Sequence, residues 1–569
     1  MGEWGVIQGA AEIEEQEEQG DDWESGSEGN DAARQTMSEF GRAGLPAALQ
    51  GGVDSFRYAT DEEWTAGFLE HGPDRSREMA KFITEQKGKL GDSGYQIDFT
   101  ADDPGKLKDP HQKKFFKLLQ ASVKGEQRDP VRCVVRGGGG VGKSYVINCF
   151  RRWLSEVGEG ATCGAETVMV LAPTGAAAFN VSGRTLHSAL KLPVPLTPKT
   201  FRRLKEGALA DFQSALSTVS VIIVDEMSMV GRRTLKVLDD RLRQAKGAHT
   251  VPFGGISVFL CGDFGQLPPI GDKVMYSADR DGGPLSLKGR TIWRSFTHSV
   301  TLRRNYRQSD FVFRDALWRL RCGKTTEKDY ALFASRGIDR LPPQERELFQ
   351  DAPFLVATHS VEEEHNMQEL RKLQGGVFRI IASHRGGRRA KQARAQDVGL
   401  EETLLLANGA RVMLRTNLWA TRGLTNGSIG ELVQVVAGEC GKLPLCALVR
   451  FPSYSGPAFF PGDPKLVPVP VVTFNFGGDS ALSRTQLPLS LSWATTIHKA
   501  QGQTHERIMV DLGSKELGLG LTYVALSRVT QLSGLLLRGN YSFERIMRIN
   551  LHPNHFARDA AEAWLDSLL

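Results

Sequence analysis

The sequence predicts an α/β protein with two parallel-sheet domains and a small antiparallel β-barrel inserted into the second. The main observation is a set of short, almost continuously apolar runs, each bounded by glycine or proline and separated by enough chain for a helix. Continuous apolarity indicates burial on both faces, which is the condition of a parallel strand covered by helices. The first half holds four such runs, at residues 131–135, 167–172, 219–224 and 256–261.

The second half repeats this pattern and then interrupts it. Residues 354–358, 489–494 and 507–512 are candidate strands of a second parallel sheet. Between them lie short strand candidates with turn signals, notably Asn426-Gly427, which favours a tight hairpin turn. These candidates, which predict the inserted barrel, are residues 410–414, 431–436, 446–451 and 469–476.

The charge of the chain is unevenly distributed. Residues 1–33 contain eleven acidic and no basic residues, although the whole chain has a net charge of +5. The remainder therefore holds 71 basic against 55 acidic residues, a surplus that suits a polyanionic partner. We predict that residues 1–100, which are polar and poorly periodic, form a disordered acidic N-terminal region.

The sequence also indicates an intracellular protein. No apolar stretch approaches the ~18 residues that cross a bilayer, and the N-terminus lacks a basic-then-apolar signal pattern. The seven cysteines show no C-x-x-C spacing, and several lie in the apolar runs, so we predict reduced, buried thiols.

A glycine-rich segment directly follows the first predicted strand. It reads Gly137-Gly138-Gly139-Gly140-Val141-Gly142-Lys143-Ser144, and a helical pattern follows it. Glycines allow the backbone to approach a phosphate chain closely, amide groups at a helix N-terminus face the anion, and Lys143 adds a positive charge. The hydroxyl of Ser144 is a ligand type that Mg²⁺ accepts. This segment predicts a nucleoside triphosphate site, the alternative being a flexible turn.

Two acidic residues and a glutamine follow the third and fourth predicted strands. The carboxyl ends of parallel strands meet at one edge of a sheet, so Asp225 and Glu226 are expected opposite the glycine segment. There Asp225 would hold Mg²⁺ and Glu226 would take the proton from an attacking water, unless both are merely solvated. Gln266 follows the fourth strand and is placed to sense the γ-phosphate.

Two arginines are candidates for stabilising charge on a transferred phosphoryl group. Arg307 lies in Arg303-Arg304-Asn305-Tyr306-Arg307-Gln308, and Arg528 ends Tyr523-Val524-Ala525-Leu526-Ser527-Arg528. If both come from the second α/β domain, the nucleotide binds in the cleft and its hydrolysis controls closure. On spacing alone, ordinary surface arginines remain the alternative.

Several further motifs occur along the chain. They are Ala172-Pro173-Thr174-Gly175-Ala176-Ala177-Ala178, Gly183-Arg184-Thr185-Leu186-His187-Ser188, Phe253-Gly254-Gly255, Gly262-Asp263-Phe264-Gly265-Gln266-Leu267-Pro268-Pro269, Thr496-Ile497-His498-Lys499-Ala500-Gln501-Gly502 and Tyr523 to Arg528. In these motifs and their order the chain resembles the PIF-type (petite integration frequency) DNA helicases of the first helicase superfamily. The resemblance covers about residues 107–548, and the form of Phe253-Gly254-Gly255 is most similar to the Helitron-transposon branch.

The resemblance implies two RecA-like P-loop NTPase domains that bind ATP and Mg²⁺ and move 5′ to 3′ along single-stranded DNA. It implies that Gln112 contacts adenine, that Gln266 couples nucleotide to DNA, and that Arg307 and Arg528 are finger residues. The residues expected near the DNA path are Thr174, Gly175, His187, His498 and Lys499. For the two histidines a satisfied core position is the alternative.

The same resemblance implies the domain division. We expect a first motor domain at 101–298, a second at 299–404 and 487–548 interrupted by the barrel at 405–486, and a C-terminal tail at 549–569. Val141 replaces the usual threonine of the family, but this position acts through its backbone. The H-x-H pair of the nuclease that accompanies Helitron helicases is absent from the sequence.

The expected activity is ATP-dependent unwinding of duplex DNA, with single-stranded and forked DNA as partners. The implied processes are DNA repair, recombination, telomere maintenance or mobile-element replication, with a nuclear location expected and a mitochondrial one left open. Three alternatives remain. They are a RecD- or relaxase-type helicase, a catalytically silent DNA-binding remnant of a transposon helicase, and a P-loop GTPase, which the lack of an N-K-x-D guanine signature in the sequence disfavours.

Overall fold

A computed structural model gives the fold. It describes residues 56–60, 63, 103–157, 165–193, 201–279, 282–393, 398–419, 422–437, 443–475, 482–539, 541–552 and 554–568. The predicted disordered region at 1–100 therefore lies outside the described residues, apart from 56–60 and 63. Within that exception, Ala59 N–H donates to Val377 O at 3.0 Å and Val377 N–H donates to Arg57 O at 2.8 Å. The prediction of disorder is wrong for residues 56–60, because their backbone pairs with another segment.

The first sheet is parallel and has six strands in the order β3-β2-β4-β5-β1-β6. Four of them confirm the apolar runs of the first half, with boundaries shifted by one or two residues. The sequence did not predict the edge strands β3 and β6. The bounds are β1 (Arg132–Arg136), β2 (Val168–Ala172), β3 (Arg184–Thr185), β4 (Val221–Val224), β5 (Ser257–Gly262) and β6 (His298–Thr301).

Helices cover both faces of this sheet, as continuous apolarity predicts. Alternate residues of β1 point to opposite faces, so Cys133 and Val135 pack in one hydrophobic cluster and Val134 in another. The first cluster includes α4 (Pro110–Val123) and α5 (Lys143–Val157), and the second includes α9 (Arg232–Lys246) and α10 (Gly283–Arg294). Cys133 is a free, buried thiol, as expected.

A second parallel sheet has four strands in the order β18-β7-β19-β20. Its bounds are β7 (Phe354–Val356), β18 (Ala494–Thr496), β19 (Ile508–Asp511) and β20 (Leu535–Arg538). The single strand predicted at 489–494 is wrong, because β17 (Leu489–Leu491) pairs with an antiparallel sheet and only β18 joins this one. Ser492 and Trp493, between them, are where the chain passes from one sheet to the other.

Antiparallel strands form the inserted part. Five of them pair in the order β14-β13-β12-β11-β17, three in the order β15-β16-β9, and two as β10-β8. The strand predicted at 469–476 is divided between two sheets, because β14 ends at Pro470 and β15 begins at Val472. β14 is an edge strand in the described residues, where its prolines remove no ladder bond. No pairing between β14 and β17 closes the five-stranded sheet there, so a closed barrel stays a prediction.

These strands have the following bounds: β8 (Phe378–Ile381), β9 (Ser383–Arg385), β10 (Thr403–Leu406), β11 (Arg411–Leu414), β12 (Ile429–Val436), β13 (Cys446–Arg450), β14 (Leu466–Pro470), β15 (Val472–Asn475) and β16 (Ser483–Gln486). The other helices are α6 (Gly175–Asn180), α7 (Leu186–Ala189), α8 (Glu206–Ala215), α11 (Phe311–Arg321), α12 (Glu327–Ala334), α13 (Pro343–Glu347), α14 (His359–Lys372), α15 (Gly387–Lys391), α17 (Leu521–Leu526), α18 (Phe543–Asn550) and α19 (Asn554–Asp566). Within the described ranges, none of the helices combines the length and apolarity needed to span a bilayer.

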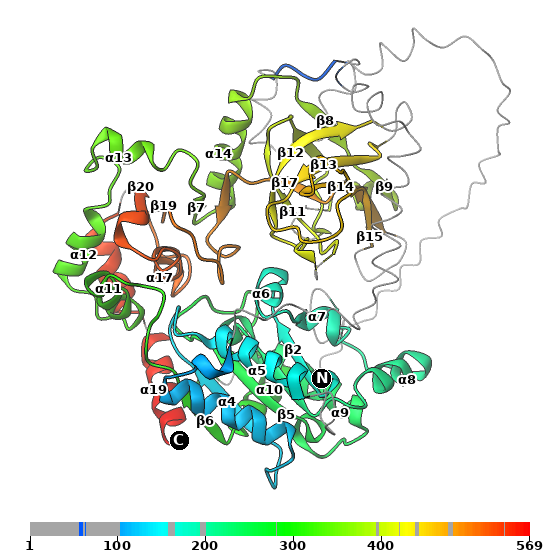
Figure 1. Ribbon diagram of the computed structural model, residues 1–569, viewed down its shortest axis with the longest axis vertical. Coiled ribbons are helices and arrows are strands. Elements are labelled where there is room, and N and C mark those ends of the chain that lie inside the picture. The colour runs from blue at the N-terminus through cyan, green and yellow to red at the C-terminus, as the bar shows by residue number, and fades with distance from the viewer. Residues whose placement is uncertain are drawn as a thin grey trace, which may run out of the picture. The chain divides into compact units, whose positions relative to one another are not determined.

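The last helix, α19, packs on the first sheet, although the sequence assigned no element to residues 549–569. It lies beside β6 (Figure 1). Leu565 is fully buried in the cluster that covers the first sheet, and the Trp564 ring lies 5.3 Å from that of Trp293. The C-terminal residues therefore complete the core of the first domain from the far end of the chain.

We expect Leu565→Ala to destabilise the protein by about 2–5 kcal/mol, because it removes a buried side chain and leaves a cavity. The matched control is Leu551→Ala, since Leu551 is 74% exposed. Urea unfolding monitored by tryptophan fluorescence measures both. Equal midpoints for the two variants would contradict the docking of α19.

Candidate active site

The glycine segment forms a tight loop between β1 and α5. Gly140 and Gly142 both have φ of 82°, a left-handed conformation that strains other residues. A Cβ on Gly137 would lie 2.6 Å from the carbonyl oxygen of Leu302, so the neighbouring strand also requires glycine there. The sequence of this loop is therefore dictated by backbone geometry.

Lys143, Ser144 and Gln112 surround this loop. The Lys143 ammonium is buried and donates to the carbonyl oxygens of Gly137 (2.7 Å) and Gly138 (3.0 Å). Gln112 lies on α4 and its side-chain amide donates to Val141 O at 3.0 Å. Val141 therefore contacts Gln112 through its backbone carbonyl, while its side chain is buried. The side chains of Lys143 and Gln112 therefore hold the backbone of this loop through its carbonyl oxygens.

The two acids lie at the end of β4, next to the loop. Asp225 is buried and accepts a hydrogen bond from Ser144 Oγ at 3.0 Å. Burial, and then the neighbouring Glu226 charge, raise the pKa of Asp225 to about 6. Glu226 has left-handed backbone angles, φ 52° and ψ 46°, which are strained for a non-glycine residue and concentrate at functional sites.

Gln501 fixes the Glu226 carboxylate from the second half of the chain. Its amide donates to Glu226 Oε2 at 3.0 Å and to Ser228 Oγ at 3.3 Å. Gln501 lies in a motif quoted above, but the sequence assigned it no role. It links the predicted proton acceptor to the segment after β18.

The two arginines converge on one glycine. A Cβ built on Gly139 would lie 3.3 Å from Arg307 Nη1 and 3.8 Å from Arg528 Nη2. Arg307 also donates to Ser527 O at 3.2 Å, so the two guanidinium groups are neighbours. Burial, and then the Arg307 charge, lower the pKa of Arg528 to about 10. The pKa of Arg307 is also lowered by burial. A buried and a half-buried cation beside a glycine loop favour binding of a polyanion.

Gln266 and its neighbours meet helix α17. Gln266 is buried, and its side-chain oxygen has no hydrogen-bond partner among the described residues. A Cβ on Gly520, which precedes α17, would lie 3.0 Å from Gln266 O. The loop after β5 is thus in contact with the segment that carries Arg528.

The five residues expected near the DNA path lie in two groups. Thr174 directly precedes α6, and its hydroxyl oxygen accepts from Ala177 N–H at 3.2 Å. A Cβ on Gly175 would lie 2.7 Å from Asn417 Oδ1 of the antiparallel part. His187 is half-buried on α7. In the second group, Lys499 forms an ion pair with Glu362 of α14 at 2.7 Å.

The histidines of both groups have a lowered pKa. Burial lowers the pKa of His187 and, together with the charge of His359, that of His498. Both rings are therefore neutral at physiological pH. Their roles stay predictions.

The donor set fits a magnesium ion. Mg²⁺ prefers oxygen ligands and retains waters and substrate phosphates in its shell. Ser144 Oγ and the buried Asp225 carboxylate lie together, and burial and the Glu226 charge raise the pKa of Asp225 although the Lys143 charge opposes that rise. Across the described residues, no cluster of three metal-ligating side chains occurs, so the remaining ligands would be water and phosphate oxygens.

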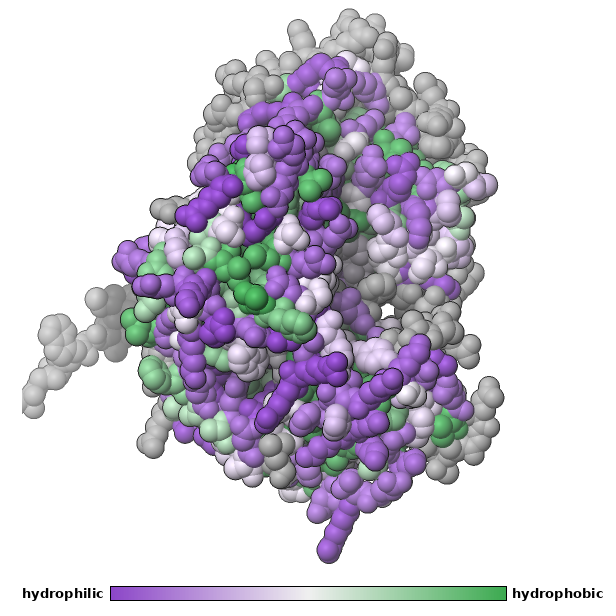
Figure 2. All heavy atoms as spheres, turned by 60° about the vertical axis from the view of Figure 1, so that its left-hand side comes forward, coloured by the Kyte–Doolittle hydropathy of each residue, from purple (hydrophilic) through white to green (hydrophobic). Residues whose placement is uncertain are grey.

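A cavity of about 370 Å³ lies against the glycine loop. Sequence reasoning missed the residues on its opposite wall, which include Arg304, Arg314 and Trp318. Trp318 lies on α11 and is 53% exposed. Phe311 and Val312 of the same helix are also exposed. Figure 2 turns the left side of Figure 1 forward and shows an apolar patch on a largely hydrophilic face. In the sequence, only the aromatic side chain of Trp318 and the arginines before it, such as Arg304, could have indicated this wall of the cavity.

A search of protein families finds the PIF1-like helicase profile over residues 107–329. The chain is 30% identical over 426 residues to the ATP-dependent DNA helicase Pif1 of Bdellovibrio bacteriovorus, covering 74% of this chain and 87% of that protein. It is 29% identical over 424 residues to the human ATP-dependent DNA helicase PIF1, covering 74% and 59%. Against three other relatives the chain spans 50%, 57% and 65% of their length.

Solved structures agree on the fold. The crystal structure of Candida albicans Pif1 helicase matches with a TM-score of 0.60 at 24% identity, covering 80% of this chain and 99% of that one. A Bacteroides Pif1 structure bound to ssDNA matches with a TM-score of 0.60 at 23% identity, covering 80% and 97%. Parallel-sheet α/β domains of this kind are RecA-like.

We expect Lys143→Ala to abolish nucleotide binding, whereas Glu226→Gln should bind ATP normally and hydrolyse it about 100-fold or more slowly, because it removes the proton acceptor. Fluorescent-nucleotide titration and a phosphate-release assay measure the two effects. Undiminished hydrolysis in both variants would refute the assignment of this site.

Proposed function

Because the chain belongs to the PIF1-like helicase family, we propose that it is an ATP-dependent DNA helicase that moves 5′ to 3′ on single-stranded DNA. The observation that carries this proposal is the convergence of Arg307 and Arg528 on Gly139. The two arginines are 221 positions apart in the chain, and Arg528 follows a helix of the second sheet's domain. Such an arrangement lets one bound triphosphate contact the glycine loop of the first domain and the arginines of the second at the same time.

Each residue of the site has a task in hydrolysis. The glycine-loop amides and Lys143 bind the phosphate chain once the lysine exchanges its carbonyl partners for phosphate oxygens. Glu226, held by Gln501, accepts the proton of the attacking water. Arg307 and Arg528 stabilise the charge that develops on the transferred phosphoryl group, an effect of about 10³–10⁵ in rate where such arginines have been measured.

Magnesium would be held by Ser144 and Asp225. When bound, it supplies positive charge that neutralises the phosphates during transfer. Asp225 keeps the Ser144 hydroxyl oriented toward the site in either case, because it accepts that hydroxyl's hydrogen bond. In this proposal Gln112 contacts the adenine. Its side-chain amide must then either give up its hydrogen bond to Val141 O or donate to both groups.

Hydrolysis is tied to DNA by contacts that join the two domains. Gln501 connects Glu226 to the segment of His498 and Lys499, and Gln266 lies against the start of α17. Movement of either segment on DNA would therefore displace a group at the phosphates. Separating a base-pair step costs only about 1.4 kcal/mol, well within the reach of such a motor.

DNA would run past Thr174, Gly175, His187, His498 and Lys499. Lys499 must then exchange Glu362 for a phosphate. The surplus of basic residues outside 1–33 provides affinity without sequence readout, so binding should weaken steeply with salt. Single-stranded and forked DNA are the proposed substrates, because one similar solved structure is a Bacteroides Pif1 bound to ssDNA and another concerns unwinding at forked dsDNA by two coordinating Pif1 helicases.

The finer assignments rest on the motifs. We place the chain in the Helitron-type branch on the form of Phe253-Gly254-Gly255, and the domain division at 101–298, 299–404, 405–486 and 487–548 on the same resemblance. The segment at 405–486 in this division is the small barrel, which interrupts the second motor domain. A nuclear location and a role in DNA repair, recombination, telomere maintenance or mobile-element replication complete the proposal.

We expect single-stranded DNA to stimulate ATP hydrolysis at least about tenfold, and a duplex with a 5′ tail to be unwound while one with a 3′ tail is not. Strand displacement with labelled oligonucleotides measures the polarity. Stimulated hydrolysis with the opposite polarity would contradict the direction. An ATPase indifferent to DNA would favour an unrelated NTPase, and no hydrolysis would favour the silent remnant.

A further inference from the structure

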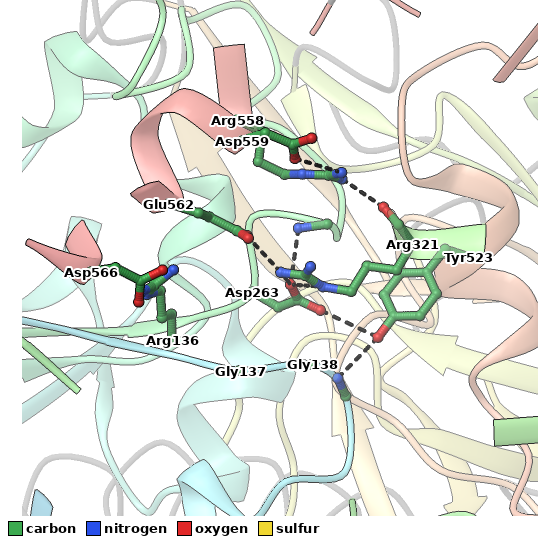
Figure 3. A network of polar contacts seen from close by, with 12 residues as sticks. Arg136, Gly137, Gly138, Asp263, Arg321, Tyr523, Arg558, Asp559, Glu562 and Asp566 are labelled. Carbon is green, nitrogen blue, oxygen red and sulfur yellow. Dashed lines mark hydrogen bonds and ion pairs between the residues drawn. The ribbon is translucent and has the colours of Figure 1, made fainter. Parts of the chain in front are cut away.

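A buried network of charged side chains lies beside the glycine loop (Figure 3). At its centre Asp263, fully buried at the end of β5, accepts hydrogen bonds from Arg321 Nε at 2.7 Å and from Gly265 N–H at 2.9 Å. Burial opposes the charge of Asp263, but Arg321 and Lys143 outweigh it, so its pKa is lowered. The pair is therefore fully charged, and its geometry is fixed by hydrogen bonds on both sides.

The network reaches the glycine loop through a tyrosine. The Tyr523 hydroxyl donates to Asp263 Oδ2 at 3.3 Å and accepts from Gly139 N–H at 3.1 Å. Tyr523 lies on α17, and Arg528 follows five positions later. Gly139 is also the residue on which the two arginines converge. The hydroxyl thus ties the helix before Arg528 to the loop that Arg528 must reach.

The other end of the network is the C-terminal helix. Glu562 of α19 accepts from Arg321 Nη2 at 2.8 Å, and Arg558 Nη1 donates to Arg321 O at 2.6 Å. Leu565 anchors the same helix in the core of the first domain. Arg321 ends α11, whose apolar side packs with α17. Helix α19, which is anchored in the core of the first domain, therefore binds Arg321 at the end of α11, a helix that packs with α17.

We propose that Arg321 is a positioning residue for hydrolysis: held by Glu562 of the C-terminal helix, it fixes Asp263 and thereby the Tyr523 hydroxyl that sets Arg528 against Gly139. The claim deepens the proposed function and its catalytic part rests on it. None of these residues touches the phosphates in this account. Arg321, Asp263 and Glu562 act through Tyr523, and Tyr523 acts through the loop and Arg528.

The charges decide which variants are informative. Arg321→Ala would leave the buried Asp263 charge without its cationic partner, a change severe enough to prevent folding. Glu562→Gln removes one charge at the partly exposed end and leaves the Arg321–Asp263 pair intact. Tyr523→Phe removes only the hydroxyl. Asp559→Asn is the matched control, because Asp559 lies on the same helix, pairs with Arg558 and does not contact Arg321.

Hydrogen–deuterium exchange of the peptide over residues 137–142 tests the positioning without any activity. We expect Glu562→Gln and Tyr523→Phe to speed exchange of this peptide about fivefold or more, because Gly139 N–H loses a fixed acceptor. Asp559→Asn should leave it at the wild-type rate, and a peptide over β4 should be unchanged in all variants. Unchanged exchange at 137–142 in both test variants would overturn the proposal.

The second readout is DNA-stimulated ATP hydrolysis, normalised to the number of nucleotide-binding sites. Glu562→Gln should lower kcat about five- to tenfold with nucleotide affinity within about twofold, because a charged hydrogen bond is replaced by a neutral one. In the Tyr523→Phe background it should lower kcat no further, since both act on the same contact. Independent, multiplicative effects would overturn the pathway through Tyr523.

The two failures are distinguishable. A wild-type protein without DNA-stimulated hydrolysis contradicts the proposed function, while the exchange experiment still decides the positioning. An active wild type in which Glu562→Gln behaves like Asp559→Asn in both measurements contradicts the positioning alone.

Discussion

The arrangement of this protein depends on the close approach of other chain segments to one buried glycine loop. The surroundings of Gly139 come from two distant segments, one that carries Arg307 and one that carries Tyr523 and Arg528. Left-handed φ angles at Gly140 and Gly142 shape the loop so that this approach is possible. The glycine loop of the first domain is therefore also the place where residues of the second domain make contact.

That contact brings together buried and half-buried charges of both signs. Burial lowers the pKa of Arg307 and of Arg528, and the Arg307 charge lowers that of Arg528 further, while burial and the Glu226 charge raise the pKa of Asp225 to about 6. The Lys143 ammonium donates hydrogen bonds to backbone carbonyls, and its charge helps to lower the pKa of Asp263. Such a site suits a ligand that carries negative charge together with a divalent cation. By contrast, Asp263 and Arg321 neutralise each other, and so form a fixed point beside the site.

Much of this could be predicted from sequence because it follows local rules. Glycine spacing, a strand before it and a helix after it specify a P-loop, and continuous apolar runs specify buried parallel strands. Asp225 and Glu226 follow from their place at a strand end. The order of motifs adds Arg307 and Arg528. Both lie more than 160 residues from Gly139 in the chain, so no local periodicity indicates that they meet it.

The rest could not be predicted, since it depends on tertiary contacts. The change of sheet between Leu491 and Ala494 is invisible in a continuous apolar run. Nothing in the pattern of α19 says that Glu562 contacts Arg321, or that Leu565 packs in the same cluster as Val134 of β1. Gln501 was part of a recognised motif, but only the structure shows its hydrogen bond to Glu226.

The most direct test of the central claim is single-turnover ATP hydrolysis by Arg528→Lys, compared with Arg548→Lys, an exposed arginine paired only with Glu544 in the described contacts. The account predicts that Arg528→Lys binds ATP within a few-fold of wild type yet hydrolyses it about 10³-fold more slowly, because a lysine cannot reproduce the planar guanidinium. Arg548→Lys should match wild type. Wild-type hydrolysis by Arg528→Lys would contradict the account.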